Sequence, residues 1–449
     1  MKIKPLNAIS PIDGRYRKKT ESLSKYFSEE SLIKYRLKIE IEYFIALCKV
    51  PLPELKNFNS KLFKNLRNIY INFSKNDAIE IKKIEKKTNH DVKAVEYYIK
   101  KKFNDLDILK YNEFVHFGLT SQDINNTAIP LSLKEALNDI YLIELNKIIK
   151  ILKSLVDKFS DVTILSKTHG QPASPTTMGK ELNVFNQRLV IQRDQLLKIP
   201  NSAKFSGATG NFNAHKVAYP NIDWKEFGKN FVTKNLGLNY SFPTTQIEHY
   251  DSFASLCDNM KRINTILIDF NQDIWLYISQ DYFKQKIKSN EVGSSAMPHK
   301  INPIDFENAE GNLGIANSIL SFFSRKLPIS RLQRDLTDST VLRNIGVPIG
   351  HTLIAFNSIL KGLNKLVINN KKIKDDLEEN WVVISEAIQT ILRREGYNNP
   401  YETLKELTRN NKIIDKKNLH SFINKLDISQ NLKNELKKIS PFNYIGILK

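Results

Sequence analysis

Cysteine is almost absent from this chain of 449 residues, which contains only Cys48 and Cys257. Two cysteines so far apart cannot form the disulfide framework of a small secreted domain, and their spacing does not resemble that of metal ligands. The sequence also lacks a His-Glu-x-x-His motif and any closely spaced histidine pair, so we expect no zinc or other metal site. The scarcity of cysteine favours a protein of the reducing cytoplasm.

Long apolar runs are missing as well. No stretch approaches the roughly 18 uninterrupted apolar residues of a membrane span. The first residues, Met1 to Pro5, are not followed by the apolar segment of a secretory signal. We therefore expect no membrane partner.

Acidic residues are scarce relative to basic ones: 48 Asp and Glu stand against 68 Lys and Arg, for a net charge of +20. Such an excess is typical of proteins that bind an anionic partner, either nucleic acid or a phosphorylated or carboxylated metabolite. The lysines are dispersed along the chain and do not form one basic arm. We attribute the charge mainly to composition and expect no nucleic acid, with a nucleic-acid binder as the less favoured alternative.

The chain is predicted to be all-α, because apolar residues recur at helical spacing over long stretches. Helices are expected at about 131–159, 178–197, 246–282, 303–323 and 348–367. The segments before and after these stretches are shorter and more charged. This pattern predicts a helical N-terminal domain (1–115), a central long-helix bundle (116–368) and a C-terminal helical domain (369–449).

Some of these helices are apolar on more than one face. In the helix expected at 131–159, Leu142, Ile143 and Leu145 lie beside the main apolar stripe. A helix with two apolar faces must be covered on both. We therefore predict that the long helices associate between chains, the alternative being a thick monomeric core.

The most informative segment is 293–303, with the sequence GSSAMPHKINP. Pro298 and Pro303 disfavour helix, so the segment is predicted to be a polar loop that leads into a helix after residue 303. Lys300 and Asn302 could together hold a carboxylate. Ser294 could act as an acid–base group only in a closed, dry loop that stabilises its alkoxide.

Other polar segments interrupt the helical pattern. His169 lies between Thr168 and Gly170, where the chain turns before a long helix, and could transfer a proton; a structural turn is the alternative. His90, between Asn89 and Asp91, has the sequence context of a helix cap. The glycine-rich stretch 207–211 matches neither a Walker loop nor a dinucleotide fingerprint.

Segment 293–303 resembles the shared loop of the fumarase/aspartase superfamily. Four further segments closely resemble the bacterial adenylosuccinate lyase family: SPIDGRY (10–16), TNHDVKAVEY (88–97), HFGLTSQDINN (116–126) and QRDLTDSTVLR (333–343). The resemblance extends from about residue 10 to 350. It implies that fumarate is eliminated from adenylosuccinate, giving AMP, and from the succinylo-carboxamide ribotide SAICAR, giving AICAR, without a cofactor.

The resemblance also implies roles for individual residues. Ser294 would be the catalytic base and His169 the general acid, while Lys300 and Asn302 would stabilise the dianionic intermediate. His90 would lie near the phosphate or the leaving group, and Glu307 would orient the loop or a histidine. The substrate-binding residues would be Arg15, Tyr16, Arg334, Ser339 and Arg343 at the phosphate, Thr120 and Ser121 at the succinyl carboxylates, Gln246 at the leaving group, and Asn89, Asp91 and Thr340 in the matching segments.

The family's fold consists of three mainly helical domains, and the central helices of four chains form a twenty-helix core. It implies a homotetramer in which His169, Thr120 with Ser121, and Ser294 come to one active site from different subunits. Two alternatives stay open: another fumarate-releasing lyase of the superfamily, such as argininosuccinate lyase, and a non-catalytic helical scaffold. Argininosuccinate lyase acts on a substrate without a nucleotide phosphate, so it does not need the cluster of Arg334, Ser339 and Arg343. A scaffold would not need the catalytic residues Ser294, His169, Lys300 and Asn302.

Overall fold

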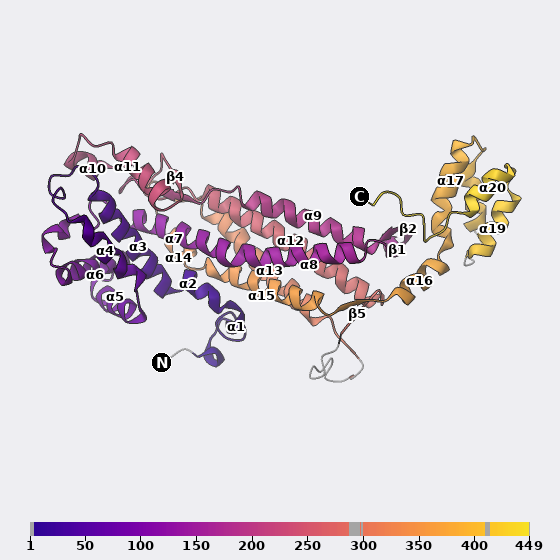
Figure 1. Ribbon diagram of the computed structural model, residues 1–449, viewed down its shortest axis with the longest axis horizontal. Coiled ribbons are helices and arrows are strands. Elements are labelled where there is room, and N and C mark those ends of the chain that lie inside the picture. The colour runs from indigo at the N-terminus through magenta and orange to yellow at the C-terminus, as the bar shows by residue number, and fades with distance from the viewer. Residues whose placement is uncertain (1–3, 287–296, 298–299, 409–413, 449) are drawn as a thin grey trace. The chain divides into compact units, whose positions relative to one another are not determined.

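A computed structural model describes residues 4–286, 297, 300–408 and 414–448. Helices dominate this part of the chain, which confirms the predicted all-α fold (Figure 1). The α-helices are α1 (Arg17–Thr20), α2 (Ser24–Phe27), α3 (Glu29–Leu47), α4 (Phe63–Ile71), α5 (Lys75–Thr88), α6 (Asp91–Asp105), α7 (Ser121–Ala136), α8 (Leu142–Lys158), α9 (Met178–Leu196), α10 (Asn213–Ala218), α11 (Trp224–Asn230), α12 (Asp251–Ser279), α13 (Ile304–Lys326), α14 (Thr337–Leu342), α15 (Gly346–Leu363), α16 (Asn370–Glu379), α17 (Ser385–Arg394), α18 (Pro400–Thr408), α19 (Lys416–Lys425) and α20 (Gln430–Lys437). The short strands are β1 (Thr163–Thr168), β2 (Gln171–Thr177), β3 (Ser202–Lys204), β4 (Asn239–Ser241), β5 (Phe283–Gln285) and β6 (Leu366–Ile368).

Internal contacts divide the chain into two compact units. The first comprises residues 1–145, 192–265 and 311–357, and the second comprises residues 146–191, 266–310 and 358–449. The long helices α9, α12, α13 and α15 each contribute residues to both units. The predicted three-domain division at residues 115 and 368 stays a prediction.

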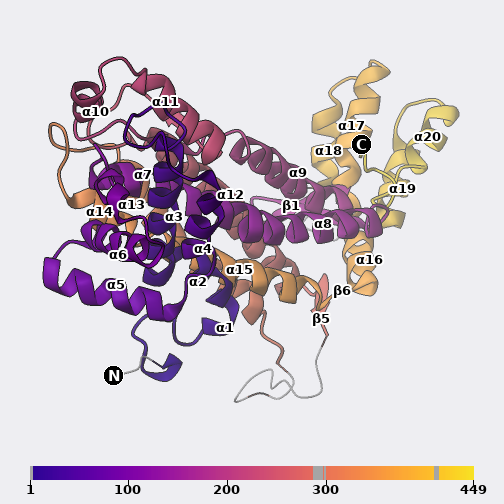
Figure 2. The ribbon, with the colours of Figure 1, turned by 60° about the vertical axis from the view of Figure 1, so that its left-hand side comes forward.

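Helix α3 is central to the core of the first unit. The Ser28 side chain caps its N-terminus by accepting a hydrogen bond from the Ser31 N–H at 3.2 Å, and Glu29 and Glu30 favour the same helix end. Most of its side chains are buried, and it contacts α4, α6 and α7 (Figure 2). A helix covered on several faces can carry buried charged residues, and Arg36 and Glu40 are such residues.

Helix α7 begins earlier than the sequence pattern predicted. The expected helix started at residue 131, after Pro130, but α7 begins at Ser121 and continues through that proline. Thr120 and Asp123 form a capping box that fixes the helix start. A proline inside a helix costs about 3 kcal/mol, and the extensive burial of α7 against α3 offsets this cost. A π-helical turn at Leu137–Tyr141 then joins α7 to α8.

The other predicted long helices are confirmed with shifted ends. The helix expected at 246–282 is α12, Asp251–Ser279, because the left-handed residues Tyr250 (φ 64) and Asp281 (φ 63) flank it. The helix expected to reach residue 367 ends at Leu363, because strand β6 follows and pairs with β5. Helix α13 begins at Ile304, which confirms the prediction that a helix starts after residue 303.

The antiparallel hairpin of β1 and β2 was not predicted. Its two-residue turn is His169 (φ 53) and Gly170 (φ 73), between the paired residues Thr168 and Gln171. Two positive φ values are those of a type I′ turn, which matches the twist of the flanking strands and favours glycine. The expectation that the chain turns at His169 before a long helix, α9, is therefore confirmed.

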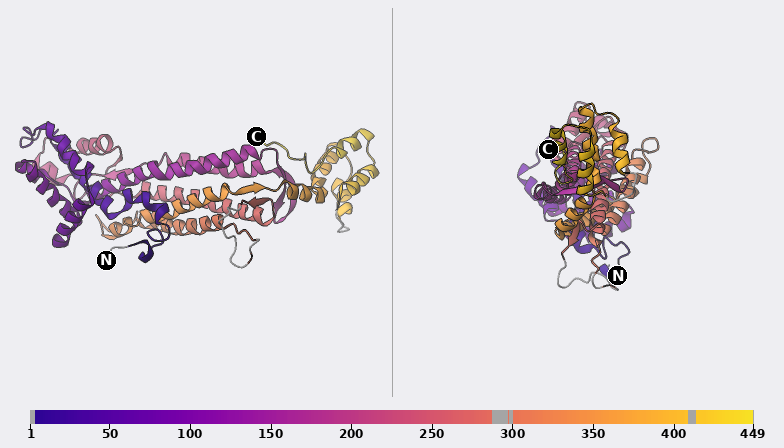
Figure 3. Two further views of the ribbon diagram at one scale, coloured as in Figure 1. Left: turned by 60° about the horizontal axis from the view of Figure 1, so that its bottom comes forward. Right: turned by 90° about the vertical axis from the view of Figure 1, so that its right-hand side faces the viewer.

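The second unit also contains helices α16 to α20. Helix α16 contacts β1, and α17 with α18 and α19 with α20 form adjacent pairs. These C-terminal helices are the orange to yellow ribbons of Figure 3. The Trp381 ring packs edge-on against His420 at 6.0 Å. In the described residues, no helix has the length and apolar character needed to cross a membrane. Both cysteines are free thiols.

Candidate functional site

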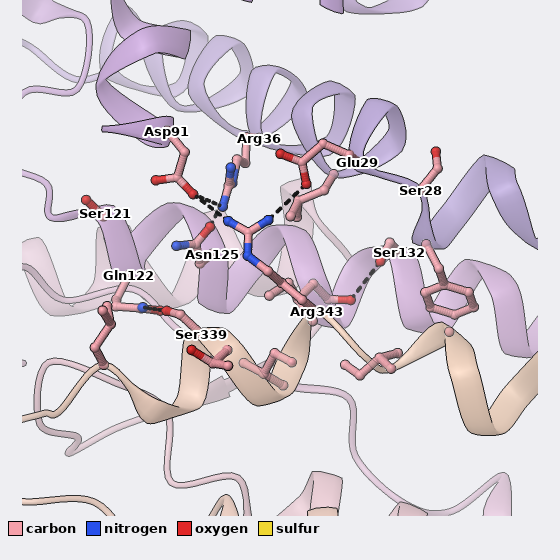
Figure 4. Close-up of a pocket in the computed structure, with 18 of the residues that line it drawn as sticks. Ser28, Glu29, Arg36, Asp91, Ser121, Gln122, Asn125, Ser132, Ser339 and Arg343 are labelled. Carbon is pink, nitrogen blue, oxygen red and sulfur yellow. Dashed lines mark hydrogen bonds and ion pairs between the residues drawn. The ribbon is translucent and has the colours of Figure 1, made fainter. Parts of the chain in front are cut away.

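A pocket of about 520 Å³ lies within the first unit. Its walls come from the start of α3, the junction of α5 and α6, the first turns of α7, and the segment around α14 (Figure 4). The polar lining residues are Ser28, Glu29, Arg36, Glu85, Asn89, His90, Asp91, Ser121, Gln122, Asn125, Ser132, Arg334, Ser339, Thr340 and Arg343. The pocket thus joins segments 88–97, 116–126 and 333–343, which the sequence had singled out.

The junction of α5 and α6 places His90 at the pocket. Asn89 ends α5 in the left-handed conformation (φ 51), and His90 caps α6, its Nδ1 accepting a hydrogen bond from the Lys93 N–H at 3.1 Å. The predicted capping role is therefore confirmed. Because Nδ1 is an acceptor, the Nε2 of a neutral His90 carries the proton, and it lies 3.5 Å from the Ser121 hydroxyl. His90 is half exposed.

Two guanidinium groups meet at Asp91. Arg36, whose side chain is only 4% exposed, donates to Asp91 at 2.7 Å, and Arg343 donates to the same carboxylate oxygen at 3.1 Å. Arg343 also pairs with Glu29 at 2.9 Å (Figure 4). Burial alone would raise the pKa of Asp91, but Arg36, the Val92 N–H and Arg343 lower it below its usual range. Asp91 is therefore a fixed anion that orients two cations.

Arg334 is a second cationic group of the pocket, and polar side chains surround it. Its guanidinium donates to the Ser339 hydroxyl at 2.8 Å and to Gln246 Oε1 at 3.4 Å. Gln122 Nε2 reaches the same hydroxyl at 3.4 Å. Gln246 in turn donates to the Ala208 carbonyl at 2.9 Å. With Arg36 and Arg343, three guanidinium groups line the pocket, and Glu29, Glu85 and Asp91 balance their charge. Guanidinium groups bind carboxylate and phosphate with two parallel hydrogen bonds, so these arginines are candidate ligands for an anion.

A buried ion pair lies behind the first turn of α7. Lys204 and Asp123 are 2.6 Å apart, and both side chains are 0% exposed. Asp123 also accepts hydrogen bonds from the N–H groups of Thr120, Ser206 and Gly207, at 2.9, 2.9 and 3.1 Å. Burial lowers the pKa of Lys204 and Asp123 raises it; the effect of burial is larger, so the pKa lies below its usual value.

The loop that precedes α7 is held by two histidines. His116 Nδ1 lies 2.6 Å from Glu40 Oε1, and the pair is largely buried. Gly118 (φ 66) lies directly over His215, where an added Cβ would be 2.7 Å from the ring, so only glycine fits there. Burial lowers the pKa of His215 to about 4, so this imidazole is neutral. Buried contacts therefore anchor the loop just before Thr120 and Ser121.

His116→Gln is expected to flatten the pH dependence of stability. Burial by itself would lower the pKa of His116, but Glu40 outweighs it, so the pKa lies above its ordinary value of 6.5. A raised pKa contributes stability that is fully present below pH 6.5 and is lost as the pH rises through the folded-state pKa. We expect the variant to lose on the order of 1 kcal/mol near pH 6 and less at higher pH. Urea midpoints at several pH values, at one protein concentration, measure the effect; a loss that is constant with pH would contradict it.

The structure places the remaining predicted residues as follows. Arg15 is exposed, with its guanidinium 5.9 Å from the Tyr16 ring centre, and neither residue lines the pocket. Thr120 and Gln246 do not line the pocket, but Thr120 directly precedes the lining residue Ser121, and Gln246 accepts a hydrogen bond from the lining residue Arg334.

Four further candidates belong to the second unit. His169 is exposed at the hairpin turn, Lys300 is exposed, and Asn302 is partly buried. Glu307, in the first turn of α13, accepts a hydrogen bond from Trp275 Nε1 at 3.1 Å. Ser294, the predicted base, lies outside the described residues. The catalytic roles of these residues therefore stay predictions.

Sequence reasoning missed several pocket residues, chiefly Glu29, Arg36 and Asn125. Asn125 lies within the segment 116–126 that carried the resemblance. Arg36 lies among the apolar residues of α3, and a charged residue on a buried helix face was the available signal. Among the described residues, no group of three or more His, Cys, Asp or Glu side chains could hold a metal ion.

Comparisons with known proteins identify the family. A family model described as "Lyase" matches residues 14–317, and one described as "Adenylosuccinate lyase C-terminal" matches residues 330–445. An adenylosuccinate lyase from Dictyostelium discoideum is 57% identical over 99% of this chain and 97% of its own length. That of Escherichia coli (strain K12) is 47% identical over 99% of this chain and 98% of its own length. The chain belongs to the adenylosuccinate lyase family.

Membership of the adenylosuccinate lyase family makes this chain a lyase. Solved structures agree on the fold: a fumarate lyase from Mesorhizobium sp. BNC1 superposes with a TM-score of 0.74 at 16% identity, over 95% of each chain. A 3-carboxy-cis,cis-muconate lactonizing enzyme from Pseudomonas putida gives 0.73 at 18% identity, over 95% of this chain and 94% of that one. At such low identity these two structures show the fold alone. The adenylosuccinate lyase assignment depends on the sequence relatives.

Proposed function

We propose that this chain eliminates fumarate from adenylosuccinate, giving AMP, and from SAICAR, giving AICAR, in purine nucleotide synthesis in the cytoplasm. The observation that carries the proposal is the identity of about half the residues to adenylosuccinate lyases along the full chain. The three arginines of the pocket, Arg36, Arg334 and Arg343, support it, because both substrates are nucleotides with a phosphate and a succinyl group. Arg334 with Ser339, and Arg343, are the proposed phosphate ligands, together with Arg15 and Tyr16.

The first turn of α7 suits the succinyl end of the substrate. The free N–H groups and the positive end of the helix dipole favour a carboxylate at such a helix start. Ser121 lines the pocket at this point, and Thr120 precedes it as the cap. We assign these two residues to the succinyl carboxylates. Asn89, Asp91 and Thr340 complete the binding set, and Gln246 holds the leaving-group end.

The proposed chemistry begins with Ser294. Its alkoxide removes a proton from the succinyl carbon next to a carboxylate, and the electron pair is held as a dianionic aci-carboxylate. Lys300 and Asn302 stabilise this charge by hydrogen bonding. The C–N bond then breaks, His169 protonates the departing nitrogen, and fumarate remains. His90 is assigned to the phosphate or leaving-group end, and Glu307 to orienting the loop or a histidine.

A homotetramer is part of the proposal. Several large apolar side chains on the long helices are exposed in the single chain: Ile143, Val184, Ile191, Trp275, Leu276, Ile304, Ile315 and Phe322. Apolar surface of this kind on long helices favours association between chains. Each active site would combine His169, Thr120 with Ser121, and Ser294 from different subunits.

The tetramer predicts that activity depends on assembly. Sedimentation should give a mass four times that of the 51.9 kDa chain. Activity per chain should fall steeply once dilution dissociates the assembly, because no single chain holds a complete site. Full activity in a sample shown to be monomeric would refute this arrangement.

One assay tests the function directly. The purified chain, without added metal, should release fumarate and AMP from adenylosuccinate, and fumarate and AICAR from SAICAR. Argininosuccinate, the substrate of the main rival within the superfamily, should yield no fumarate. Cleavage of argininosuccinate in preference to both nucleotides would overturn the proposal.

Arg334→Ala is expected to raise the KM for adenylosuccinate about 10- to 100-fold and to change kcat less. A charge-assisted hydrogen bond contributes about 1.5–3 kcal/mol, and each 1.4 kcal/mol corresponds to a factor of ten. Arg331→Ala is the matched control, because Arg331 is on the same segment but is exposed and pairs with Asp335, which does not line the pocket. Steady-state kinetics measure both variants, and an unchanged KM in Arg334→Ala would exclude the phosphate role.

A further inference from the structure

The buried pair of Asp123 and Lys204 has no role in the chemistry proposed above. Its two side chains are completely buried within the first unit, and Phe205, which follows Lys204 in the chain, is buried as well. Taking two charges out of water costs several kcal/mol per ion, and well-packed apolar residues are often as stable or more stable in such places. Stability alone is therefore a weak reason for the pair, so its hydrogen bonds indicate what it does.

The Asp123 carboxylate connects two backbone segments. One oxygen, Oδ2, accepts the hydrogen bond from the Thr120 N–H at 2.9 Å, which fixes the start of α7. The other, Oδ1, accepts from the N–H groups of Ser206 and Gly207 and from the Lys204 ammonium. The two oxygens thus accept hydrogen bonds from different segments. Asparagine, the neutral side chain of the same size, has only one oxygen that can accept.

The Lys204 ammonium extends this connection. It donates to Asp123 and to the Gly207 carbonyl at 2.6 and 2.5 Å. The adjacent Ala208 carbonyl accepts the hydrogen bond of Gln246, whose Oε1 accepts from Arg334. The ion pair therefore fixes the backbone at Thr120 and Ser121 on one side and, through loop 206–208, the position of Gln246 and Arg334 on the other.

We propose that Asp123 and Lys204 are positioning residues, which hold the two substrate-binding segments of the pocket at a fixed separation. This inference rests on the proposed function, since it assumes that Thr120, Ser121, Gln246 and Arg334 bind substrate. Neither Asp123 nor Lys204 lines the pocket, so they act through the groups that they hold. Displacement of a binding group by about 1 Å can cost on the order of 100-fold in catalysis.

The test replaces both charges together. Asp123→Asn/Lys204→Met leaves no unpaired buried charge, so folding is expected to be largely retained, but the amide cannot accept hydrogen bonds from both segments. We expect the KM for adenylosuccinate to rise about tenfold or more, and kcat to fall by a smaller factor. Glu42→Gln/Arg67→Met is the matched control: it neutralises a pair of the same unit, at 2.7 Å, whose residues are not among those lining the pocket. Its KM and kcat should equal those of the unmodified protein.

A second variant covers the case in which the double variant does not fold. Asp123→Glu keeps the charge pair but moves the carboxylate by one methylene, so the KM should rise here too. A folded double variant, or a folded Asp123→Glu protein, with unchanged KM and kcat would overturn the inference. Failure of the proposed function is distinguishable, because the unmodified protein would then release no fumarate.

Discussion

Ser294→Ala is expected to lower kcat for fumarate release about 10²- to 10⁴-fold, the range that general base catalysis contributes. The substitution removes the group that takes the carbon proton. It leaves the proposed anchors of the substrate in place, namely Arg334, Ser339 and the start of α7. KM should therefore stay within a few-fold of the unmodified value, and product AMP should inhibit both proteins to the same extent.

The neighbouring hydroxyl provides the control for this variant. Ser295→Ala alters the same loop by the same atom, so a general disturbance of segment 293–303 would affect both variants alike. A large loss in Ser294→Ala with a much smaller one in Ser295→Ala identifies the base. If the larger loss occurs in Ser295→Ala, the base is assigned to the wrong serine; if both losses are modest, the base lies outside this pair.

The helices could be predicted from the sequence because their signals are local and long. Over 20 to 30 residues, apolar spacing defines a helix irrespective of its neighbours, and α9, α12, α13 and α15 were found in this way. Their ends depend on single residues. The positive φ of Tyr250, for example, delays the start of α12, and nothing in the apolar spacing indicates it.

Two features were missed because distant parts of the chain determine them. Helix α7 tolerates Pro130 only because its burial against α3 offsets the proline's cost, and the sequence alone does not reveal that contact. The hairpin of β1 and β2 is short and carries polar side chains, so its strands lack a clear two-residue alternation. His169 was recognised as a turn residue, whereas the type I′ geometry required the structure.

The residues of the candidate site also form two groups: those that could be predicted from the sequence and those that could not. Residues such as His90 and Arg334 were predicted because they lie in polar segments with a distinctive order, and the structure brings both to one pocket. Arg36 and Lys204 lie outside the segments that carried the resemblance. Their importance follows from partners far away in the chain: Asp91 for Arg36 and Asp123 for Lys204. The sequence near Arg36 or Lys204 does not indicate which distant residue each of them pairs with.

Lys204→Met alone is expected to lower the free energy of unfolding by about 3–5 kcal/mol, the loss found when one partner of a buried ion pair is removed. The methionine fills the volume of the lysine stem, so packing changes little. The cost arises because Asp123 keeps its charge in a site that is 0% exposed, with only N–H groups left to stabilise it.

Arg67→Met distinguishes burial from the mere loss of a salt bridge. Its partner Glu42 keeps the hydrogen bond from Tyr70 at 2.8 Å, and Arg67 itself is 38% exposed, so we expect a loss of about 0–1 kcal/mol. Urea midpoints at equal protein concentration measure both variants. Equal losses would mean that the Asp123 site admits water. A large loss in Lys204→Met that Asp123→Asn recovers would instead show that the unpaired carboxylate is the cause, since the double variant lacks the same lysine but carries no buried charge.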